Sequence, residues 1–345
     1  MSHPRVLILH NDPVLPQDHP DFESEREVLD VVEVVEEYLS DAGLATSRLA
    51  ISHDPSALLD GLREQKPHVV FNLFEGTGDD GSTEAAVACL LEWTGMPFTG
   101  CSSQAMMLAR NKPLAKRLLK ETGLSTPEFD VIQTEPIPQC ALDWPVIVKL
   151  AMQDASVGLD QGSVVSDQSG FRDRVSLLLE QYRQPVLVER FVPGREFNVG
   201  IIEIPSLRSL PVAEIEFLNK GGGFWPIVTY DAKWKVGSID DIATPPCCPA
   251  KIPAELSAKL QEMALSAFRL LSCRDYARVD FRVSPNGLPF ILEVNPNPDF
   301  HPNCGFARGL WAAGLSHAQF AVDLVHAALA RRPADAALSG RGISR

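Results

Sequence analysis

The order of apolar and polar residues over the first third of the chain is typical of strands that alternate with helices. Short apolar runs predict buried strands, and apolar residues at helical spacing predict amphipathic helices. In chain order these segments are 5–9, 25–39, 69–73 and 82–93. Gly43 and Gly95 directly follow the two helical segments, as is common at helix ends. The alternation predicts a parallel sheet with helices on its faces, in an α/β domain at 1–110.

Beyond residue 110 the pattern predicts a further set of strands and helices. The predicted helices lie at 112–121, 171–181, 254–271, 305–313 and 316–330. The predicted strands lie at 145–150, 162–165, 186–191, 276–283 and 288–294. A second domain is therefore expected to begin near Asn111, and 331–345 is expected to be a loose tail.

The last two strands are predicted to form a hairpin through Ser284-Pro285-Asn286-Gly287, because a tight Asn-Gly turn favours positive φ at both central residues. Pairing these strands gathers Asp280, Glu293 and Asn295 with Arg278 beside them, since side chains repeat every second residue. Three oxygen ligands on a rigid sheet suit a hard cation such as Mg²⁺. A hairpin whose charges simply face solvent is the alternative. The proline-containing loop directly after the second strand favours the cation site, since irregular loops more often carry function.

A lysine closes the otherwise apolar strand at 145–150. Lys149 either extends to solvent or presents its charge to a ligand. The loop that follows, Gln153–Gly158, is rich in small residues such as Ser156 and is able to fold over phosphates with its backbone N–H groups. As a lone motif this loop is a weak signal.

A second candidate binding segment is 188–197, which reads VERFVPGREF. Pro193-Gly194 suits an ordinary type II turn between two strands. Flanking acids at Glu189 and Glu196 around an apolar centre also suit a nucleotide, and we favour this interpretation over the plain turn.

Charge and cysteine content restrict the partners. The formal net charge is −14 with no basic block to offset it, which argues against nucleic acid or an anionic membrane as partner. No apolar stretch approaches the roughly 20 residues that span a bilayer, and the apolar run near the start is too short for a secretory signal. Seven cysteines without a CxxC pair fit reduced thiols, so a cytoplasmic location is expected.

Three segments carry a resemblance to a known family. ARVDF, LEVNPNPD and GFARGLWAAGLSH, at 277–281, 292–299 and 305–317, resemble the metal-binding end of ATP-grasp ligases of the D-alanine–D-alanine ligase branch. The resemblance covers roughly 1–330 and implies a three-domain ATP-grasp architecture, with the N-terminal parallel-sheet domain followed by two sheet-containing domains at 111–192 and 193–330 that hold ATP between them. It also implies Mg²⁺ or Mn²⁺ as cofactor, small amino-acid-like substrates, and a homodimer.

The resemblance assigns residues to this site. The implied ATP-binding residues are Lys112, Lys149, Glu189, Arg190, Phe191, Val192 and Glu196. The implied metal ligands are Asp280, Glu293 and Asn295, and the implied catalytic residues are Glu25, Ser156, Lys233 and Arg278. By this resemblance Lys112 and Lys149 contact the ATP phosphates, and the backbone around Phe191 and Val192 pairs with the adenine edge. Glu189 and Glu196 would bind polar atoms of adenosine.

The four catalytic residues have separate implied roles. Glu25 holds the amino group of the first substrate, although an acid in the first turn of a helix is also favoured by the helix dipole alone. Ser156 lies in the loop that covers the triphosphate, and Arg278 stabilises the oxyanion formed when the amine attacks. Lys233 contacts phosphate from YDAKW, a predicted loop that together with Asn219–Trp225 forms a lid that excludes water.

Three positions depart from the family pattern. Phe74 stands where the family has a His that contacts substrate, Asp299 where it has a Gly, and Cys304 near a Ser that anchors the acceptor carboxylate. An acid at 299 would repel such a carboxylate unless it is paired, so D-alanine is in doubt as the acceptor. The alternatives are an ATP-binding regulatory protein or a ligase of other substrates. A bicarbonate-using, biotin-carboxylase-like subunit is disfavoured because Glu25 matches the amino-acid ligases.

Overall fold

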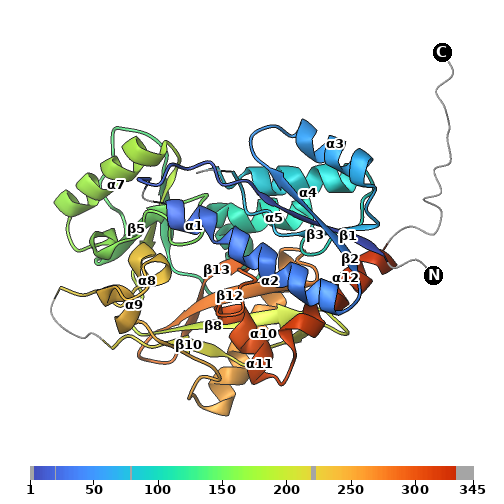
Figure 1. Cartoon of the computed structure of the whole chain (residues 1–345). Helices are drawn as coiled ribbons and strands as arrows, with labels where there is room; N and C mark the ends of the chain where they lie inside the picture. Colours follow the sequence, from blue (N-terminus) through green and yellow to red (C-terminus); the bar gives the residue numbers. More distant parts are fainter. Residues whose placement is uncertain (1–3, 20, 78–79, 219–222, 332–345) are drawn as a thin grey trace.

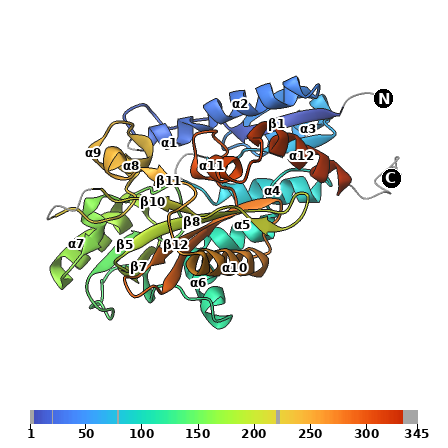
Figure 2. The same cartoon turned by 90° about the horizontal axis from the view of Figure 1, so that it is seen from below.

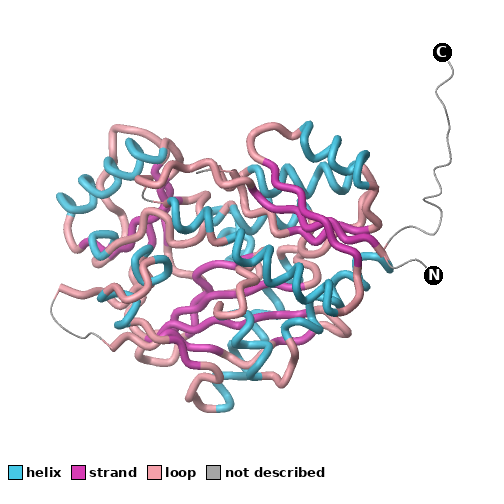
Figure 3. The backbone as a smooth tube through the Cα atoms, in the orientation of Figure 1, coloured by secondary structure: helices cyan, strands magenta, loops and turns pink. Residues whose placement is uncertain are grey.

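The computed structural model describes residues 4–19, 21–77, 80–218 and 223–331, and organises them around three sheets (Figures 1 and 3). Each sheet is built from one continuous part of the chain, and these parts lie within the three segments expected from the sequence. The first sheet is parallel and the other two are antiparallel. The expected mixed α/β architecture is confirmed, whereas the domain boundaries stay a prediction.

The first sheet is the expected parallel one. Its strands, in the order β2-β1-β3, are β2 (Ala45–Ile51), β1 (Arg5–Asn11) and β3 (Val69–Asn72). Helices cover both faces, with α2 (Val28–Asp41) and α12 (His317–Ala330) on one side and α3 (Ser56–Gln65) and α4 (Thr83–Trp93) on the other. The central strand is buried on both faces, which is why it has a continuous apolar run.

Two elements of this layer were not predicted from the sequence, β2 and α3. β2 is an edge strand of which only Ile51 is buried, so it has no apolar run to detect. Ser82 precedes α4 as predicted, but it makes no side-chain cap; its hydroxyl donates to Asp80 instead.

The second sheet is four-stranded, in the order β4-β7-β5-β6. Its strands are β4 (Phe129–Ile132), β7 (Val186–Arg190), β5 (Val146–Leu150) and β6 (Val164–Val165). A short 3₁₀ helix, η1 (Gln161–Ser163), precedes β6, and α7 (Gln168–Tyr182) packs on the sheet through Phe171, Val175 and Leu178. The strands predicted at 145–150, 162–165 and 186–191 are confirmed to within two residues.

The third sheet supplies most of the polar face of the site. Its strands are β11 (Pro246–Cys247), β10 (Ala213–Ile215), β8 (Arg195–Ile202), β12 (Tyr276–Val283) and β13 (Pro289–Asn295), in that order, with β9 (Arg208–Ser209) beside β8. α10 (Ala254–Leu270) packs against its apolar side through Leu260, Ala264 and Phe268. The predicted role of this helix in core packing is therefore confirmed.

The remaining helices connect the layers (Figures 1 and 2). They are α1 (Phe22–Arg26), α5 (Ser103–Arg110), α6 (Lys112–Glu121), α8 (Tyr230–Trp234), α9 (Ile239–Ala243) and α11 (Gly305–Ala312). The helix predicted at 25–39 is interrupted at Glu27, which separates α1 from α2. The prediction of a loop at YDAKW was wrong: these residues form α8, capped by the Thr229 side chain, which accepts from the Ala232 N–H. Residues 219–222 of the expected lid lie outside the described residues.

The end of the described chain packs back on the first layer. α12 contributes Phe320, Leu324 and Val325 to the same core as α2 and β3. Arg331, placed in the tail by the sequence, pairs with the buried carboxylate of Asp275 at 2.6 Å. Among the residues that the structure describes, none of the helices combines the length and apolar character needed to cross a membrane.

Candidate active site

Two antiparallel strands bring the expected cation ligands together. On β12 and β13, Asp280 stands directly opposite Glu293, and Arg278 stands opposite Asn295. Directly opposite residues have Cβ atoms about 4.5–5.5 Å apart, so these polar side chains share one face of the sheet. The predicted gathering of the four groups is confirmed as a geometric fact.

The hairpin differs from the prediction in two details. Of its turn residues only Gly287 has a positive φ, of 79°, because the turn is closed by Ser284 and Leu288 rather than by a two-residue loop. The register also shifts after Asp280, leaving Leu292 unpaired as a bulge. Glu293 and Asn295 lie beyond the bulge and keep the register that sets them opposite Asp280 and Arg278.

The Arg278 guanidinium forms two hydrogen bonds, each 2.8 Å long, with the carboxylate of Asp280. Glu293 lies 3.4 Å from the Lys112 ammonium, and the Asn295 side-chain oxygen accepts from the Asn297 N–H. The described residues include no group of three His, Cys, Asp or Glu side chains arranged as a metal site. The expected ligand set has only two carboxylates, the third oxygen being that of an amide.

Three lysines lie close enough to acids of this sheet to interact with them electrostatically. Lys112 begins α6 and is paired with Asp154 as well as Glu293. Lys149 on β5 and Lys116 on α6 both pair with Glu189 on β7, and the Lys149 contact is 2.6 Å. Lys116 and Glu293 interact electrostatically, as do Lys149 and Glu196. Lysines of α6 and of the second sheet therefore lie near acids of the third sheet.

The Lys116–Glu189–Lys149 group carries a formal excess of one positive charge. Glu189 is 1 % exposed. Burial opposes its ionisation, but the two lysines outweigh burial and lower the pKa of Glu189. Burial lowers the pKa of Lys116 to about 8, because one carboxylate shared between two ammonium groups compensates neither fully. Buried uncompensated positive charge favours an anionic ligand. Glu189 was expected to contact adenosine, and the structure pairs its carboxylate with lysines instead.

The segment expected to hold adenosine lies beside this group. Glu196 pairs across the strands with Arg282 at 2.9 Å, and burial raises the pKa of Glu196. The Phe191 and Val192 side chains are buried, and the Phe191 N–H donates to the Pro145 carbonyl. Arg190 lies at the surface, 4.0 Å from Glu128.

The loop expected to cover phosphates is held by the segment around α8. Ala155 and Ser156 both adopt left-handed φ, of 58° and 59°, which is costly for residues other than glycine. The Trp234 indole donates to the Ala155 carbonyl and the Ser156 hydroxyl donates to the Val228 carbonyl. The loop and α8 therefore form one structural unit. Lys233 of α8 and the two neighbours of Ser156, Ala155 and Val157, line the pocket described next.

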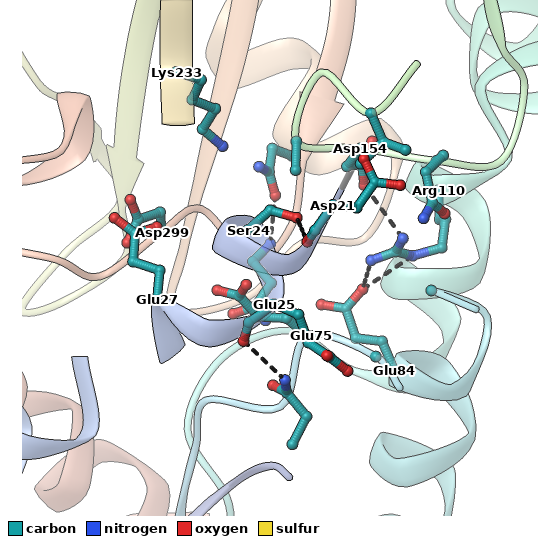
Figure 4. A pocket seen from close by; sticks show the side chains of 18 of the residues that line it. Asp21, Ser24, Glu25, Glu27, Glu75, Glu84, Arg110, Asp154, Lys233 and Asp299 are labelled. Atoms are coloured by element: carbon teal, nitrogen blue, oxygen red, sulfur yellow. Dashed lines mark hydrogen bonds and ion pairs between the residues drawn. The ribbon is translucent and has the colours of Figure 1, made fainter. Parts of the chain in front are cut away.

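A pocket at this end of the molecule has seven acids among its lining residues, and we call it the acidic pocket (Figure 4). Its carboxylates are those of Asp21, Glu25, Glu27, Glu75, Glu84, Asp154 and Asp299, and its cationic residues are Arg110 and Lys233. The acids come from α1, from the residue between α1 and α2, from α4 and from four loops. Asn295 also lines the pocket, which connects it to the cation-ligand face.

Glu25 lies in this pocket, as expected for a substrate-binding residue. One of its carboxylate oxygens accepts from the backbone N–H groups of Val14 and Leu15, at 2.9 and 2.7 Å. Part of its function is therefore to hold the preceding loop. Phe74 stands where the family pattern has a polar residue that contacts substrate. Its side chain is buried in the core of the first layer and offers no polar group to a ligand.

Repulsion among the pocket acids perturbs their ionisation. Burial, followed by the charge of Asp299, raises the pKa of Glu27 to about 7. The same two causes raise the pKa of Glu75 to about 8, although this side chain keeps an exposed edge toward the pocket. Cys304 donates to the Asp299 carbonyl at 2.8 Å, and burial raises its pKa to about 12, so it is a neutral thiol.

Replacing Glu27 with Gln is expected to raise the melting temperature at about pH 8 by about 1–3 °C, and to leave it unchanged near pH 4. The folded pKa of about 7 lies above 4.5, the ordinary value of a glutamate side chain, so the folded state retains a proton that the unfolded chain releases. The free energy of unfolding therefore falls as the pH rises through this window, and the amide removes that loss.

Thermal unfolding of the variant across this pH range, beside Glu33→Gln on the exposed face of α2, measures the effect. A stabilisation that is equal at both pH values, or equal in the two variants, would contradict the assignment.

Several site residues were not found from the sequence. Lys116 is one of several lysines and arginines on α6, and nothing in the local pattern separates it from the others. Glu84 and Arg110 form a buried ion pair between α4 and α5, and Arg110 also faces Asp154 at 3.7 Å. From the sequence alone, a charged residue on an amphipathic helix cannot be recognised as buried, because its ion-pair partner on another element is not known.

Comparison with known proteins gives a consistent result. Residues 118–326 match the family model described as D-ala D-ala ligase C-terminus. An uncharacterized protein, y4sG, of Sinorhizobium fredii is 32% identical over 291 residues, covering 83% of this chain and 81% of that protein. D-alanine--D-alanine ligase A of Mesorhizobium japonicum is 35% identical over 277 residues, covering 77% and 72%. The crystal structure of D-alanine--D-alanine ligase from Bacillus anthracis complexed with ATP has a TM-score of 0.73 at 17% identity, covering 95% of this chain and 98% of that one.

Proposed function

This chain belongs to the D-alanine–D-alanine ligase family, and on that premise we propose that it is an Mg-ATP-dependent ligase that joins a carboxylate to an amine. The family resemblance inferred from the motifs of the hairpin is thereby confirmed. The amide would form through an acyl phosphate, with release of ADP and phosphate. The observation that carries the proposal is the grouping of Asp280, Glu293 and Asn295 on one face of β12 and β13, with the Lys112 ammonium 3.4 Å from Glu293.

In this proposal the surrounding lysines position and neutralise the triphosphate of ATP. Lys149 and Lys116 share one carboxylate and so retain a net positive charge for the phosphates. Lys112 and Lys233 add charge at the junction with the acidic pocket. The backbone of 190–192 and the acid Glu196 are our candidates for the adenosine site. Phosphoryl transfer depends on such placement and charge compensation more than on covalent help from the protein.

The residues on the hairpin fit a divalent cation. Asp280, Glu293 and Asn295 are oxygen donors on one face, and their carboxylates are only partly exposed, at 15% and 27% for Asp280 and Glu293. Mg²⁺ or Mn²⁺ held by these residues would supply positive charge that stabilises the transferring phosphoryl group. Arg278, oriented by its paired hydrogen bonds to Asp280, would stabilise the negative oxygen that develops when the amine attacks the acyl carbon.

The first substrate would place its carboxylate toward these lysines and its amino group toward Glu25 in the acidic pocket. Ser156 and its loop would cover the phosphates, since α8 and the loop are joined by hydrogen bonds. Water exclusion by this unit would protect the acyl phosphate from hydrolysis. A cytoplasmic location and a homodimer remain predictions that accompany the family assignment.

The proposal is tested by measuring ADP release from Mg-ATP against a panel of amino acids and amines. We expect turnover that requires Mg²⁺, an acid and an amine together, with phosphate released in equal amount to ADP. Tight ATP binding without turnover by any pair would instead support the regulatory alternative, and ADP release that is independent of the amine would exclude a carboxylate–amine ligase.

A further inference from the structure

The acidic pocket holds more carboxyl groups than its own cations, together with Lys112 on Asp154, can pair with. Seven carboxylates line it against two cationic side chains among the described residues. Arg110 is already committed, because its guanidinium pairs with Glu84 and lies 3.7 Å from Asp154. The second, Lys233, lies over the Trp234 ring, 4.5 Å from its centroid, at the side of the pocket.

Two of these carboxylates have no partner of their own. Within the described part of the chain, neither the Glu27 nor the Glu75 side chain forms a hydrogen bond or an ion pair; Asp299 and Lys233 influence both from a distance, as do other nearby acids. Asp299 accepts from the His301 N–H but has no cationic partner. Figure 4 shows Glu27 and Asp299 next to each other and Glu75 apart from them, on the side of Glu84. Acids in such an arrangement repel one another unless they are protonated or a ligand supplies a cation.

An uncharged group in the same pocket gives an independent indication. Asn11, at the end of β1, is 2% exposed and lines the pocket, yet its side-chain oxygen has no hydrogen-bond partner among the described residues. Its orientation is determined by the amide nitrogen, which donates to the Glu25 carbonyl at 3.5 Å, and a carbonyl can only accept. A buried acceptor without a donor is costly, so the missing partner is an N–H or O–H group of a ligand.

We propose that the substrate held in the acidic pocket carries a second ammonium group, as a diamino acid does. This inference rests on the proposed ligase function. One amino group would lie at Glu25 as the family assignment implies, and the additional ammonium would be bound by Glu27, Glu75 and Asp299. Its N–H donors would also satisfy the acceptor of Asn11. Asp299 is then a binding residue for a cation, which accounts for an acid at a position where it would repel a carboxylate.

The test compares substrates that are matched in shape and differ in charge. D- and L-lysine are paired with D- and L-norleucine in the ADP-release assay. The same pairs are titrated calorimetrically with Mg²⁺ and a non-hydrolysable ATP analogue present. We expect the cationic member of at least one pair to have at least about tenfold higher kcat/KM or affinity, because the pocket is partly buried and excess negative.

Glu27→Gln and Glu75→Gln should each reduce this preference several-fold, whereas Glu33→Gln, the same change on the exposed face of α2, should leave it unchanged. Equal or better performance of the neutral members, or no binding of any member, overturns the inference. If the substrates without a second ammonium group support ADP release as well as the cationic ones, the ligase function stands and the diamino substrate class does not. If cationic members bind in preference but no pair is turned over, the substrate class holds and the ligase function does not.

Discussion

Replacing Glu293 with Gln is expected to reduce Mg²⁺-dependent ADP release by at least about 100-fold, since even groups that only orient a metal ligand contribute 10–100-fold. The amide keeps the shape of the side chain and removes the charge that, opposite Asp280, would hold the cation. The fold should be retained, because Lys112 keeps its ion pair with Asp154 and its hydrogen bond to the Gln153 carbonyl.

The measurement is ADP release as a function of Mg²⁺ concentration, with urea unfolding as the check on folding. A higher Mg²⁺ requirement in the variant would identify a lost ligand. Glu121→Gln, at the exposed end of α6, serves as the control of equal charge change. An unchanged Mg²⁺ dependence with normal activity would show that the cation is bound elsewhere.

Replacing Glu189 with Gln is expected to lower the free energy of unfolding by about 3–5 kcal/mol, the usual cost of removing one partner from a buried ion pair. The change leaves Lys116 and Lys149 close together in the interior, at 2% and 11% side-chain exposure, without the carboxylate that separates them. The positive charge of Lys116, whose pKa burial already lowers, becomes still harder to retain.

Urea denaturation at neutral pH measures this loss. Glu128→Gln is the matched control, because Glu128 is exposed and its ion pair with Arg190 is 4.0 Å long, so the expected change is within about 0.5 kcal/mol. Adding Lys116→Met to Glu189→Gln should restore part of the lost stability by removing one of the two repelling charges. A loss below about 1 kcal/mol in the single variant would be incompatible with a buried three-residue charge group.

Local patterns predicted much of the architecture. The apolar runs of β1, β3, β5 and β7 and the helices α4, α6, α10 and α12 lie within a few residues of the ranges expected. The alternation along β12 and β13 by itself predicted that four polar side chains share one face, as the strand register confirms. Elements without an apolar run were missed, such as β2, whose side chains are mostly polar because it is an edge strand.

Charge partners could not be predicted in the same way. Glu189 was assigned to a nucleotide from its position in a motif, and the structure shows that it pairs with a lysine 40 residues away on β5 and with another on α6. The acidic pocket is likewise assembled from α1, α4 and loops that are distant in sequence. No spacing rule connects Glu27 with Asp299, which contribute to the same electrostatic field.

The sequence by itself determined the alternation of faces and the hairpin on which the cation ligands lie. Those features follow from backbone geometry, whose periods of 2 and 3.6 residues are written locally in the order of side chains. Only the tertiary structure decided which charges are compensated and which are left for a ligand. Electrostatic energy depends on distance and burial in three dimensions, and residues that are remote along the chain set both.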